Sequence, residues 1–436
     1  MAALLVLCLT GFTVMLGQGM VSPILPLYGR SFGVGAAVVG FLVTAFGLAR
    51  VLTDLPAGYL SERFGAGRVL LVGPAITAAA SLMAGLAGSF WALVFWRFWQ
   101  GVGSALFTTA AMARVAELSP PGRTAKNLAL FQGFHLLGTS FGPSLGGWAA
   151  QYGGYRAPFF FFAGLATAGV LAAGVGRRRG RKAAGQNRDE ELAAGAGFAE
   201  PGAQGEGNLL AGEDKGREGG KAEAGRKGEG ICRLLANKQF LLIIMVNFSI
   251  FFARAGARQT IVPLLGAAEL GLKGGQIGFA LTLIALGNLS MVYLAGWLGD
   301  RWGVRQVLVP GILLASGGYF LFAASADYAS YLLAAAVVGL GTGLGGPLPA
   351  AYAVQVAGSA GRGVVMGAIR FFGDTGFMAG PVALGLIADA LGYRAALVAN
   401  ALLMASLALA FAVLAARSGH GAGEAEAPGQ GRPGSA

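Results

Sequence analysis

Long apolar stretches recur along the chain and are separated by short segments that contain glycine, proline and charged residues. Most are close to the roughly 20 residues that an α-helix needs to cross the hydrocarbon core of a bilayer. The pattern predicts an all-α integral membrane protein with twelve spanning helices. The predicted spans are Leu4–Leu27, Ala36–Leu60, Val69–Ala87, Phe90–Ala113, Leu128–Ala150, Ala157–Gly176, Phe240–Leu265, Gln276–Leu298, Val307–Ala324, Tyr328–Val356, Val364–Ala388 and Ala395–Ala416.

Two segments break this pattern. Residues 177–238, between the sixth and seventh spans, are rich in Gly, Ala, Glu and Lys, and residues 417–436 have a similar composition. Neither can bury enough apolar surface to fold, so we expect a disordered cytoplasmic linker and a disordered cytoplasmic tail. The predicted domains are therefore a six-helix half over 1–176 and a second over 239–416.

The composition supports a membrane protein and excludes several other classes. The chain has 436 residues, of which 55% are hydrophobic and 12% charged, whereas soluble domains carry roughly 25% charged residues. Its only cysteines, Cys8 and Cys232, define no disulfide framework, and no metal or cofactor is expected. The net charge of +12 lies mostly in loops, which indicates membrane topology and not nucleic-acid binding.

Lysine and arginine set the predicted orientation, because cytoplasmic loops carry an excess of both. With the amino terminus inside, the short inner loops and the tail hold ten such residues and the outer loops hold four. We therefore expect a multi-pass protein of the cell membrane with both termini cytoplasmic. The first apolar run is long for a cleaved signal and is predicted to stay as a span.

An internal repeat with a constant offset of 238 positions joins the two halves. It relates four landmarks in the first half to four in the second: Gly58–Gly65 to Gly296–Gly303, Gly101 and Gly103 to Gly339 and Gly341, Gly142-Pro143 to Gly380-Pro381, and Gly154–Arg156 to Gly392–Arg394. A parallel repeat of this kind predicts two halves in the same orientation, with a small-molecule site near the bilayer midplane. Two such halves suffice for a monomer.

The loop after the second span, and its repeat, resemble the Gly-x-x-x-Asp/Glu-Arg-x-Gly signature of the major facilitator superfamily. The matching residues are Gly58, Glu62, Arg63, Gly65 and Arg68, and then Gly296, Asp300, Arg301, Gly303 and Arg305. The resemblance implies that Glu62 docks on the start of the eleventh helix and latches an inner gate, with Arg63, Arg68 and Arg114 in its charge cluster. The alternative is a solvated basic loop that only sets topology.

The fifth span carries a narrower resemblance. Its sequence GTSFGPSLGG, with Gly138, Gly142, Pro143, Gly146 and Gly147, is similar to the fifth-helix motif of the drug:proton antiporters in that superfamily. The resemblance implies efflux driven by proton entry. Glycines four apart let another backbone approach closely, and proline bends a helix. We expect this thin helix to act as a gate at the seam between the halves; the alternative is tight packing without gating.

Charges inside spans are costly and tend to face a cavity or a partner. Arg50 and Asp54 lie four positions apart on the second span, and Arg370 and Asp374 on the eleventh. Each pair can neutralise itself across one helix face. The functional alternative makes Asp374 a proton site, with Asp54 and His135 as further proton-coupling candidates; His135 can also be a packing residue.

The other candidates line a predicted substrate cavity. Three arginines are expected to form a positively charged wall of this cavity or to hold a gate closed: Arg97, Arg254 and Arg258. Arg258 can also extend its guanidinium to the outer membrane–water interface. Arg370 belongs to the same candidates, as do the polar residues Gln18, Asn288 and Gln355, which can orient a ligand or tie helices together.

The expected function is secondary active transport by alternating access, as proton-coupled efflux of a drug or xenobiotic. The partners would be a small molecule, protons and the lipid bilayer. The chain has no HExxH pair and no Walker loop, so an enzyme is not expected. The alternative is an uptake symporter or facilitator for an organic anion or metabolite, because the first span lacks an acid and five arginines face two aspartates within the spans.

Overall fold

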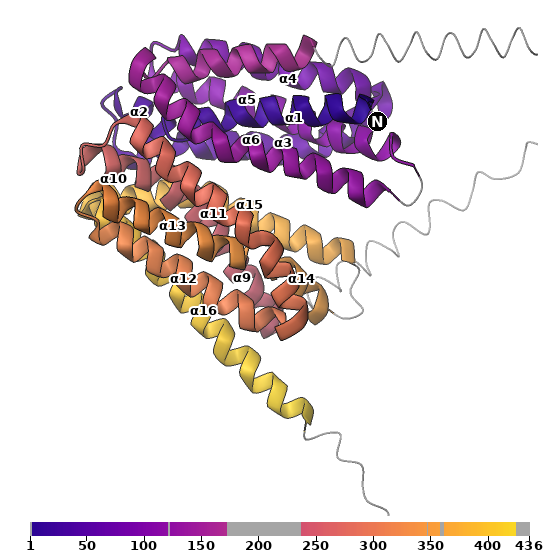
Figure 1. Cartoon of the computed structure of the whole chain (residues 1–436), viewed down its shortest axis with the longest axis vertical. Helices are drawn as coiled ribbons and strands as arrows, with labels where there is room; N and C mark the ends of the chain where they lie inside the picture. The colour runs from indigo at the N-terminus through magenta and orange to yellow at the C-terminus, as the bar shows by residue number, and fades with distance from the viewer. Residues whose placement is uncertain (1, 121–122, 172–236, 347, 358–361, 424–436) are drawn as a thin grey trace, which may run out of the picture. The chain divides into compact units, whose positions relative to one another are not determined.

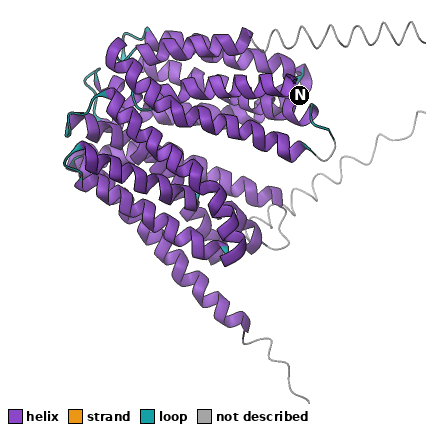
Figure 2. Cartoon of the chain, in the orientation of Figure 1, coloured by secondary structure: helices purple, strands orange, loops and turns teal. Residues whose placement is uncertain are grey.

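The computed structural model describes residues 2–120, 123–171, 237–346, 348–357 and 362–423. Helices account for nearly all of this part of the chain and no strand occurs in it (Figure 2). The all-α prediction is therefore confirmed. Among the described helices, nine are long and apolar enough to cross a membrane on their own composition. α5 and α6 are as long, but Arg97 and Gln100 in α5, and Gln132 and His135 in α6, make them more polar.

The chain divides into two compact units. Unit 1 takes in Met1–Ser22 and Ala45–Cys232, and unit 2 takes in Pro23–Thr44 and Arg233–Ala436. The division is not a simple cut in the middle of the sequence. Residues 23–44, from the first two spans, group with the second half, so helix α3 (Ala36–Phe64) begins in unit 2 and continues in unit 1.

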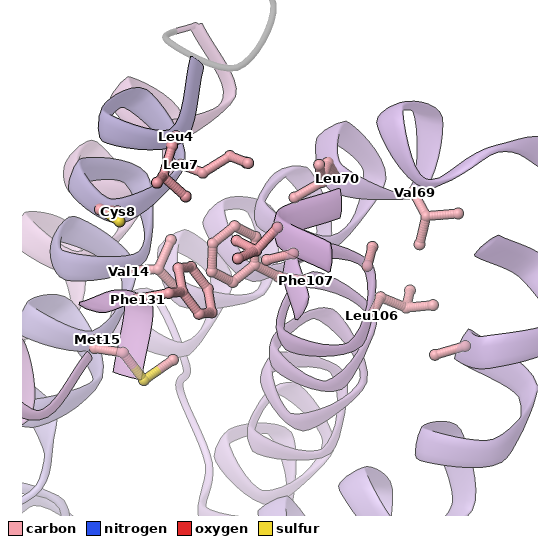
Figure 3. Close-up of a cluster of buried hydrophobic side chains, with 14 residues drawn as sticks. Leu4, Leu7, Cys8, Val14, Met15, Val69, Leu70, Leu106, Phe107 and Phe131 are labelled. Carbon is pink, nitrogen blue, oxygen red and sulfur yellow. The ribbon is translucent and has the colours of Figure 1, made fainter. Parts of the chain in front are cut away.

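Unit 1 contains the first six predicted spans except for residues 23–44. Besides most of α3, it consists of α1 (Ala2–Val21), α4 (Ala66–Gly85), α5 (Phe90–Glu117), α6 (Thr124–Gly153) and the helix Ala157–Leu171 (Figure 1). One cluster of buried apolar side chains joins α1, α4, α5 and α6 (Figure 3). Phe107 and Phe131 lie in this cluster and are fully buried. The core thus fixes α1 against α6.

Unit 2 contains the other six spans and a short N-terminal segment. Its helices are α2 (Leu25–Arg30), the start of α3, α9 (Lys238–Phe252), η1 (Ala253–Ile261), α10 (Val262–Ala268), α11 (Gly274–Trp302), α12 (Val304–Ala324), α13 (Tyr328–Gly345), α14 (Leu348–Val356), α15 (Arg362–Leu391) and α16 (Tyr393–Gly423). The two units together give the twelve predicted spans.

Three spans depart from a single regular helix. The first is interrupted before α2, where Pro26 occupies the first turn of the new helix. The seventh contains a nine-residue π-helical segment, η1, and the tenth is divided into α13 and α14. α16 extends to Gly423, past the expected end at Ala416. The linker prediction falls on residues that lie almost entirely outside the described part, as does the prediction for the tail beyond Gly423.

Candidate functional site

The glycines of the fifth span lie against α1, and we call this contact the first seam. A Cβ added to Gly138 would lie 2.6 Å from the carbonyl oxygen of Phe12, and one added to Gly142 would lie 2.6 Å from that of Leu16. A Cβ at Gly146 would overlap the carbonyl of Met20. The two backbones therefore touch along several turns, and only glycine fits at these positions of α6. The motif joins two helices inside unit 1, and its gating role between the halves stays a prediction.

The eleventh span makes the equivalent contact in unit 2, which we call the second seam. Cβ atoms added to Gly376 and Gly380 would overlap the carbonyls of Phe248 and Phe252. Gly256 of η1 faces the same surface, because its Cβ would lie 2.5 Å from the carbonyl oxygen of Gly380. The Gly-Pro landmark of the repeat thus marks the same kind of helix crossing in both units.

Arg97 is buried in unit 1, with 6% of its surface exposed. Its guanidinium lies 4.7 Å from the ring centroid of Phe46 and donates a hydrogen bond to the side-chain oxygen of Gln100. Gln100 in turn donates to Ser81 Oγ at 2.9 Å. Close packing makes this burial possible, since a Cβ at Gly101 would lie 2.6 Å from the carbonyl oxygen of Phe46. A buried cation held by a ring and a hydrogen-bonded amide is a preorganised positive group.

The remaining ionisable candidates of unit 1 differ in their surroundings. Arg50 and Asp54 are half-buried on α3. His135 is buried; its Nδ1 lies 3.3 Å from the carbonyl oxygen of Phe131, and its ring packs edge-on against the Phe131 ring at 4.3 Å. Its Nε2 has no hydrogen-bond partner among the described residues. These apolar surroundings favour the packing role that the sequence left open for His135.

The π-helical segment of unit 2 carries two arginines. Arg254 is exposed on the surface of the unit, and Arg258 is half-buried and donates to the carbonyl oxygen of Leu281 at 3.4 Å. A π-helix departs from the regular backbone pairing, and such segments occur often at functional sites. Two buried tyrosines hold its ends, because Tyr319 donates to the carbonyl of Ala253 and Tyr331 to that of Val262. Sequence reasoning missed both tyrosines, since a buried tyrosine in an apolar span gives no separate signal.

Arg370 and Asp374 form the ion pair that their spacing predicts. The Nε atom of Arg370 lies 3.7 Å from Oδ2 of Asp374, and 64% of the arginine side chain and 35% of the aspartate side chain are exposed on unit 2. The pair is long for a charge-assisted hydrogen bond. The carboxylate and the guanidinium are therefore held near each other by the attraction between their charges.

Two of the polar candidates tie helices together. Gln18 accepts a hydrogen bond of 3.5 Å from Ser104, which joins α1 to α5. Asn288 donates to Thr342 at 3.3 Å, which joins α11 to α13. Gln355 is exposed on α14. The structure therefore favours the helix-tying role for Gln18 and Asn288.

The loop-motif residues lie at helix ends. Glu62 is exposed, and Arg63 donates to the hydroxyl of Tyr59 at 3.1 Å. Arg114 pairs with Glu117 on its own helix at 2.7 Å, and the charge cluster around Glu62 stays a prediction. Gly65 and Gly303 adopt φ values of 82° and 93°, a conformation that favours glycine. The predicted docking of Glu62 on the start of the eleventh helix stays a prediction, because residue 361 and the side chains of residues 362–364 are not described.

The sequence matches the Major Facilitator Superfamily over residues 7–256 and again over 246–433. It is 25% identical over 390 residues to an uncharacterized MFS-type transporter of Methanocaldococcus jannaschii, which covers 89% of this chain and 91% of the relative. It is also 28% identical over 161 residues to the quinolone resistance protein NorA of Staphylococcus aureus. That match covers 37% of this chain and 40% of NorA.

Solved transporter structures share the fold along nearly the whole chain. A bacterial homologue of the human lysosomal transporter Spinster superposes with a TM-score of 0.72 at 17% identity, over 96% of this chain and 97% of the other. A peptide transporter in complex with sulfate gives 0.71 at 16% identity, over 96% and 95%. The nucleoside transporter NupG gives 0.69 at 13%, over 94% and 99%. At these identities the likeness shows the fold alone.

Proposed function

The chain belongs to the major facilitator superfamily, and from this premise we propose that it is a proton-coupled exporter of a drug or other xenobiotic. Secondary transport across a membrane, by a multi-pass protein, follows from the family itself. The direction, the coupling ion and the substrate are the proposed part. We further propose that the protein works as a monomer in the cell membrane, with both termini cytoplasmic.

The first seam carries this proposal. Gly138, Gly142 and Gly146 are the residues by which the fifth span resembles the drug:proton antiporters, and all three are in backbone contact with α1. Where these three glycines meet α1 no side chain of α6 separates the two backbones, so a small tilt of α6 needs little side-chain repacking along this part of the crossing. The partial similarity to NorA supports the same direction of transport.

Asp374 is the proposed proton carrier. As a carboxylate it is attracted by Arg370 at 3.7 Å, and as a neutral acid it loses that attraction. Protonation would thus weaken the hold of Asp374 on the Arg370 side chain, which is largely exposed. Asp54, which shares half-buried surface of α3 with Arg50, is the second proposed carrier. The loop motif is proposed to latch the inner side through Glu62 and Asp300.

One observation favours a second candidate, an organic anion or acidic metabolite as substrate. Arg254 and Arg258 both lie on η1, and each brings a positive charge to the seventh span. Arg97, buried on α5, adds another in unit 1. An uptake symporter or a facilitator for an anion would use these groups to attract its substrate.

Transport by the purified protein in liposomes with an imposed pH gradient distinguishes the proton-coupled exporter from the anion transporter. A fluorescent quinolone and a fluorescent carboxylate of similar size are the probes. Proton-coupled efflux predicts that the quinolone moves opposite to the proton flow; the second candidate predicts movement of the carboxylate, with the protons or independent of them. If neither gradient moves either probe, the proposed coupling and both substrate classes are rejected.

The role of Asp374 has its own test. Asp374→Asn should abolish quinolone movement driven by the pH gradient and leave quinolone exchange without a gradient intact. Asp327→Asn is the matched control, because Asp327 caps α13 outside the spans and asparagine can also cap. Proton-driven transport that persists in Asp374→Asn, at the same pH dependence, would reject this role.

A further inference from the structure

A third close helix crossing lies in unit 2, where the first turns of α3 meet the second half of α15. A Cβ added to Gly40 would lie 2.6 Å from the carbonyl carbon of Pro381, and one added to Gly385 would lie 2.5 Å from Cα of Ala37. Thr44 donates a hydrogen bond of 2.7 Å to the carbonyl oxygen of Met378. The contact is therefore backbone to backbone over several turns, and we call it the α3–α15 crossing.

Asp389 closes one end of this crossing. Its two carboxylate oxygens accept hydrogen bonds from the backbone amides of Ala36 at 2.7 Å and Ala37 at 2.9 Å. These amides belong to the first turn of α3, where a helix has no backbone partner for its N–H groups. A carboxylate there also complements the positive end of the helix dipole. Asp389 thus supplies a two-pronged cap to a helix that begins 353 positions earlier in the chain.

The helix has no cap of its own. Gly35 occupies the cap position, since its carbonyl accepts the first helical hydrogen bond from Val39, and glycine offers no side-chain acceptor. A Cβ at Gly35 would lie 2.7 Å from Oδ2 of Asp389. By contrast, α5, α9 and α13 are capped locally by Ser89, Asn237 and Asp327. At α3 the cap position holds a glycine, which has no side-chain acceptor and leaves space for the carboxylate of Asp389.

This arrangement makes the cap conditional. A local cap moves with its helix, whereas a cap from α15 exists only while the α3–α15 crossing is closed. Because α3 is one continuous helix that runs on beyond Thr44 to Phe64, a tilt of the whole helix strains this crossing. The small residues on both sides leave few side-chain contacts to hold it, so the charged cap is its strongest polar link.

We propose that Asp389 is a latch that holds the α3–α15 crossing closed in one transport state and releases the start of α3 in the other. It is a positioning residue, because it acts through the helix that it caps. The latch lies at the opposite end of α3 from the loop motif of Glu62. The proposal rests on alternating access but names a closing contact that the loop motif does not supply.

Cysteine labelling in lipid nanodiscs tests the latch without substrate or a pH gradient. Thr44→Cys, in a background with Cys8 and Cys232 replaced by serine, places one thiol within the crossing. Asp389→Ala should raise its rate of maleimide labelling about fivefold, the shift in equilibrium that loss of a typical helix cap produces. Asp327→Ala, which removes the local cap of α13, is the matched control and should leave the rate unchanged.

Two further variants keep the test decisive. Gly35→Ala leaves the acid in place but puts a methyl group against its carboxylate, so labelling should rise here too, even if Asp389→Ala folds poorly. Gly35→Ser combined with Asp389→Ala restores a local cap without restoring the link to α15. Labelling should stay high in this double variant if Asp389 is a latch.

The outcomes separate the latch from the proposed transport. A labelling rate that returns to the parent value in the double variant would show that Asp389 only caps α3, and unchanged labelling in both Asp389→Ala and Gly35→Ala would also overturn the latch. Neither result bears on quinolone efflux, which is measured in the liposomes. Conversely, a protein that moves neither probe but opens in Asp389→Ala would keep the latch and lose the proposed substrate.

Discussion

The first seam and the second seam are built on glycines at equivalent positions of the repeat, but the helices that face these glycines differ in their polar residues. Gly138 and Gly142 of α6 correspond to Gly376 and Gly380 of α15 at the repeat offset of 238, and all four bring helix backbones into contact. The helix that faces them is regular in unit 1, where it is α1, and contains the π-helical segment η1 in unit 2. The packing surface has been kept in both halves, while the opposing helix has diverged.

The charged residues inside the spans are not repeated between the two halves. Arg254 and Arg258 of η1 correspond to Leu16 and Met20 of α1, and Arg97 of α5 corresponds to Ala335 of α13. The pair Arg370–Asp374 corresponds to Gln132 and Leu136. The glycines that both halves share are therefore best explained by helix packing. The charged residues that only one half carries are the better candidates for substrate and proton chemistry.

Polar side chains in the two seams come from opposite helices. In the first, His135 extends from α6 toward Gly11 of α1, where a Cβ would lie 3.0 Å from its Cε1 atom. In the second, Asn247 extends from α9, donates to the carbonyl of Ile369 at 2.8 Å and is accommodated by Gly373, the counterpart of His135. Each seam pairs one bulky polar residue with one glycine, which supports a packing role for His135.

The largest expected effect is on the glycine contacts themselves. Gly146→Leu would force a side chain into the carbonyl of Met20, and overpacking against backbone should cost about 3 kcal/mol or more. Gly380→Leu should do the same in the second seam. Thermal unfolding of the purified variants measures both. Gly133→Ala, on the same helix as Gly146 but with open space around its Cβ, is the control; a Gly146→Leu protein as stable as this control would contradict the backbone contact.

These seams show what the sequence could and could not predict. Glycine at four-residue spacing within an apolar run predicts a close helix contact, and the repeat predicts that it occurs twice. The spacing does not identify the partner, so α1 was not expected to face the motif. The π-helical segment ARAGARQTI was also not predicted, because its support comes from Tyr319 and Tyr331, which lie far away in the sequence.

The candidate site also contains some contacts that the sequence predicts and others that it does not. The ion pair of Arg370 and Asp374 is a local property of helix spacing and was predictable. The ring of Phe46 over Arg97 and the cap from Asp389 to α3 join segments distant in sequence. Asp389 lies just past the predicted end of the eleventh span at Ala388, so it was not among the charged residues within the spans and its partner could not be named.

The buried arginine of unit 1 gives the second largest effect. Loss of a charged hydrogen bond in Arg97→Leu should cost about 1.5–3 kcal/mol, since Gln100 loses its partner. Gln100→Leu should cost less, and the double variant should cost less than the two single changes together because they act on one network. A double-mutant cycle of thermal unfolding, with transport measured in parallel, checks this. Strictly additive losses would mean that the two side chains do not work as a unit.

A third test compares the arginines that follow the two seams. Arg394 pairs with Glu269 at 2.6 Å and donates to the carbonyl oxygens of Ala323 and Ser325, whereas its repeat counterpart Arg156 is exposed. Arg394→Ala should lower the free energy of unfolding by about 1 kcal/mol, and Arg156→Ala by less than about 0.5 kcal/mol. Equal losses in thermal unfolding would show that Arg394 contributes no more than its counterpart.

The smallest expected effect concerns the two helix caps that the repeat places at equivalent positions, Ser89 of α5 and Asp327 of α13. Asp327 Oδ1 accepts from the backbone N–H of Ser330 at 2.8 Å and from its hydroxyl at 2.6 Å, and these bonds lower the pKa of the carboxyl. A group whose pKa is lower in the folded state stabilises the protein above its unfolded pKa, about 3.9. This contribution is lost as the pH falls through the folded value.

Ser89 accepts one hydrogen bond, from the N–H of Ala92 at 3.3 Å, and does not titrate. Asp327→Ser should therefore remove part of the loss of melting temperature between about pH 6 and about pH 3, while Ser89→Asp should add to it. Each variant serves as the control for the other, because every other acid in the chain is unchanged. If Asp327→Ser and the parent lost stability in parallel over this range, the acid sensitivity would lie elsewhere, and the two caps would be equivalent in chemistry as well as in position.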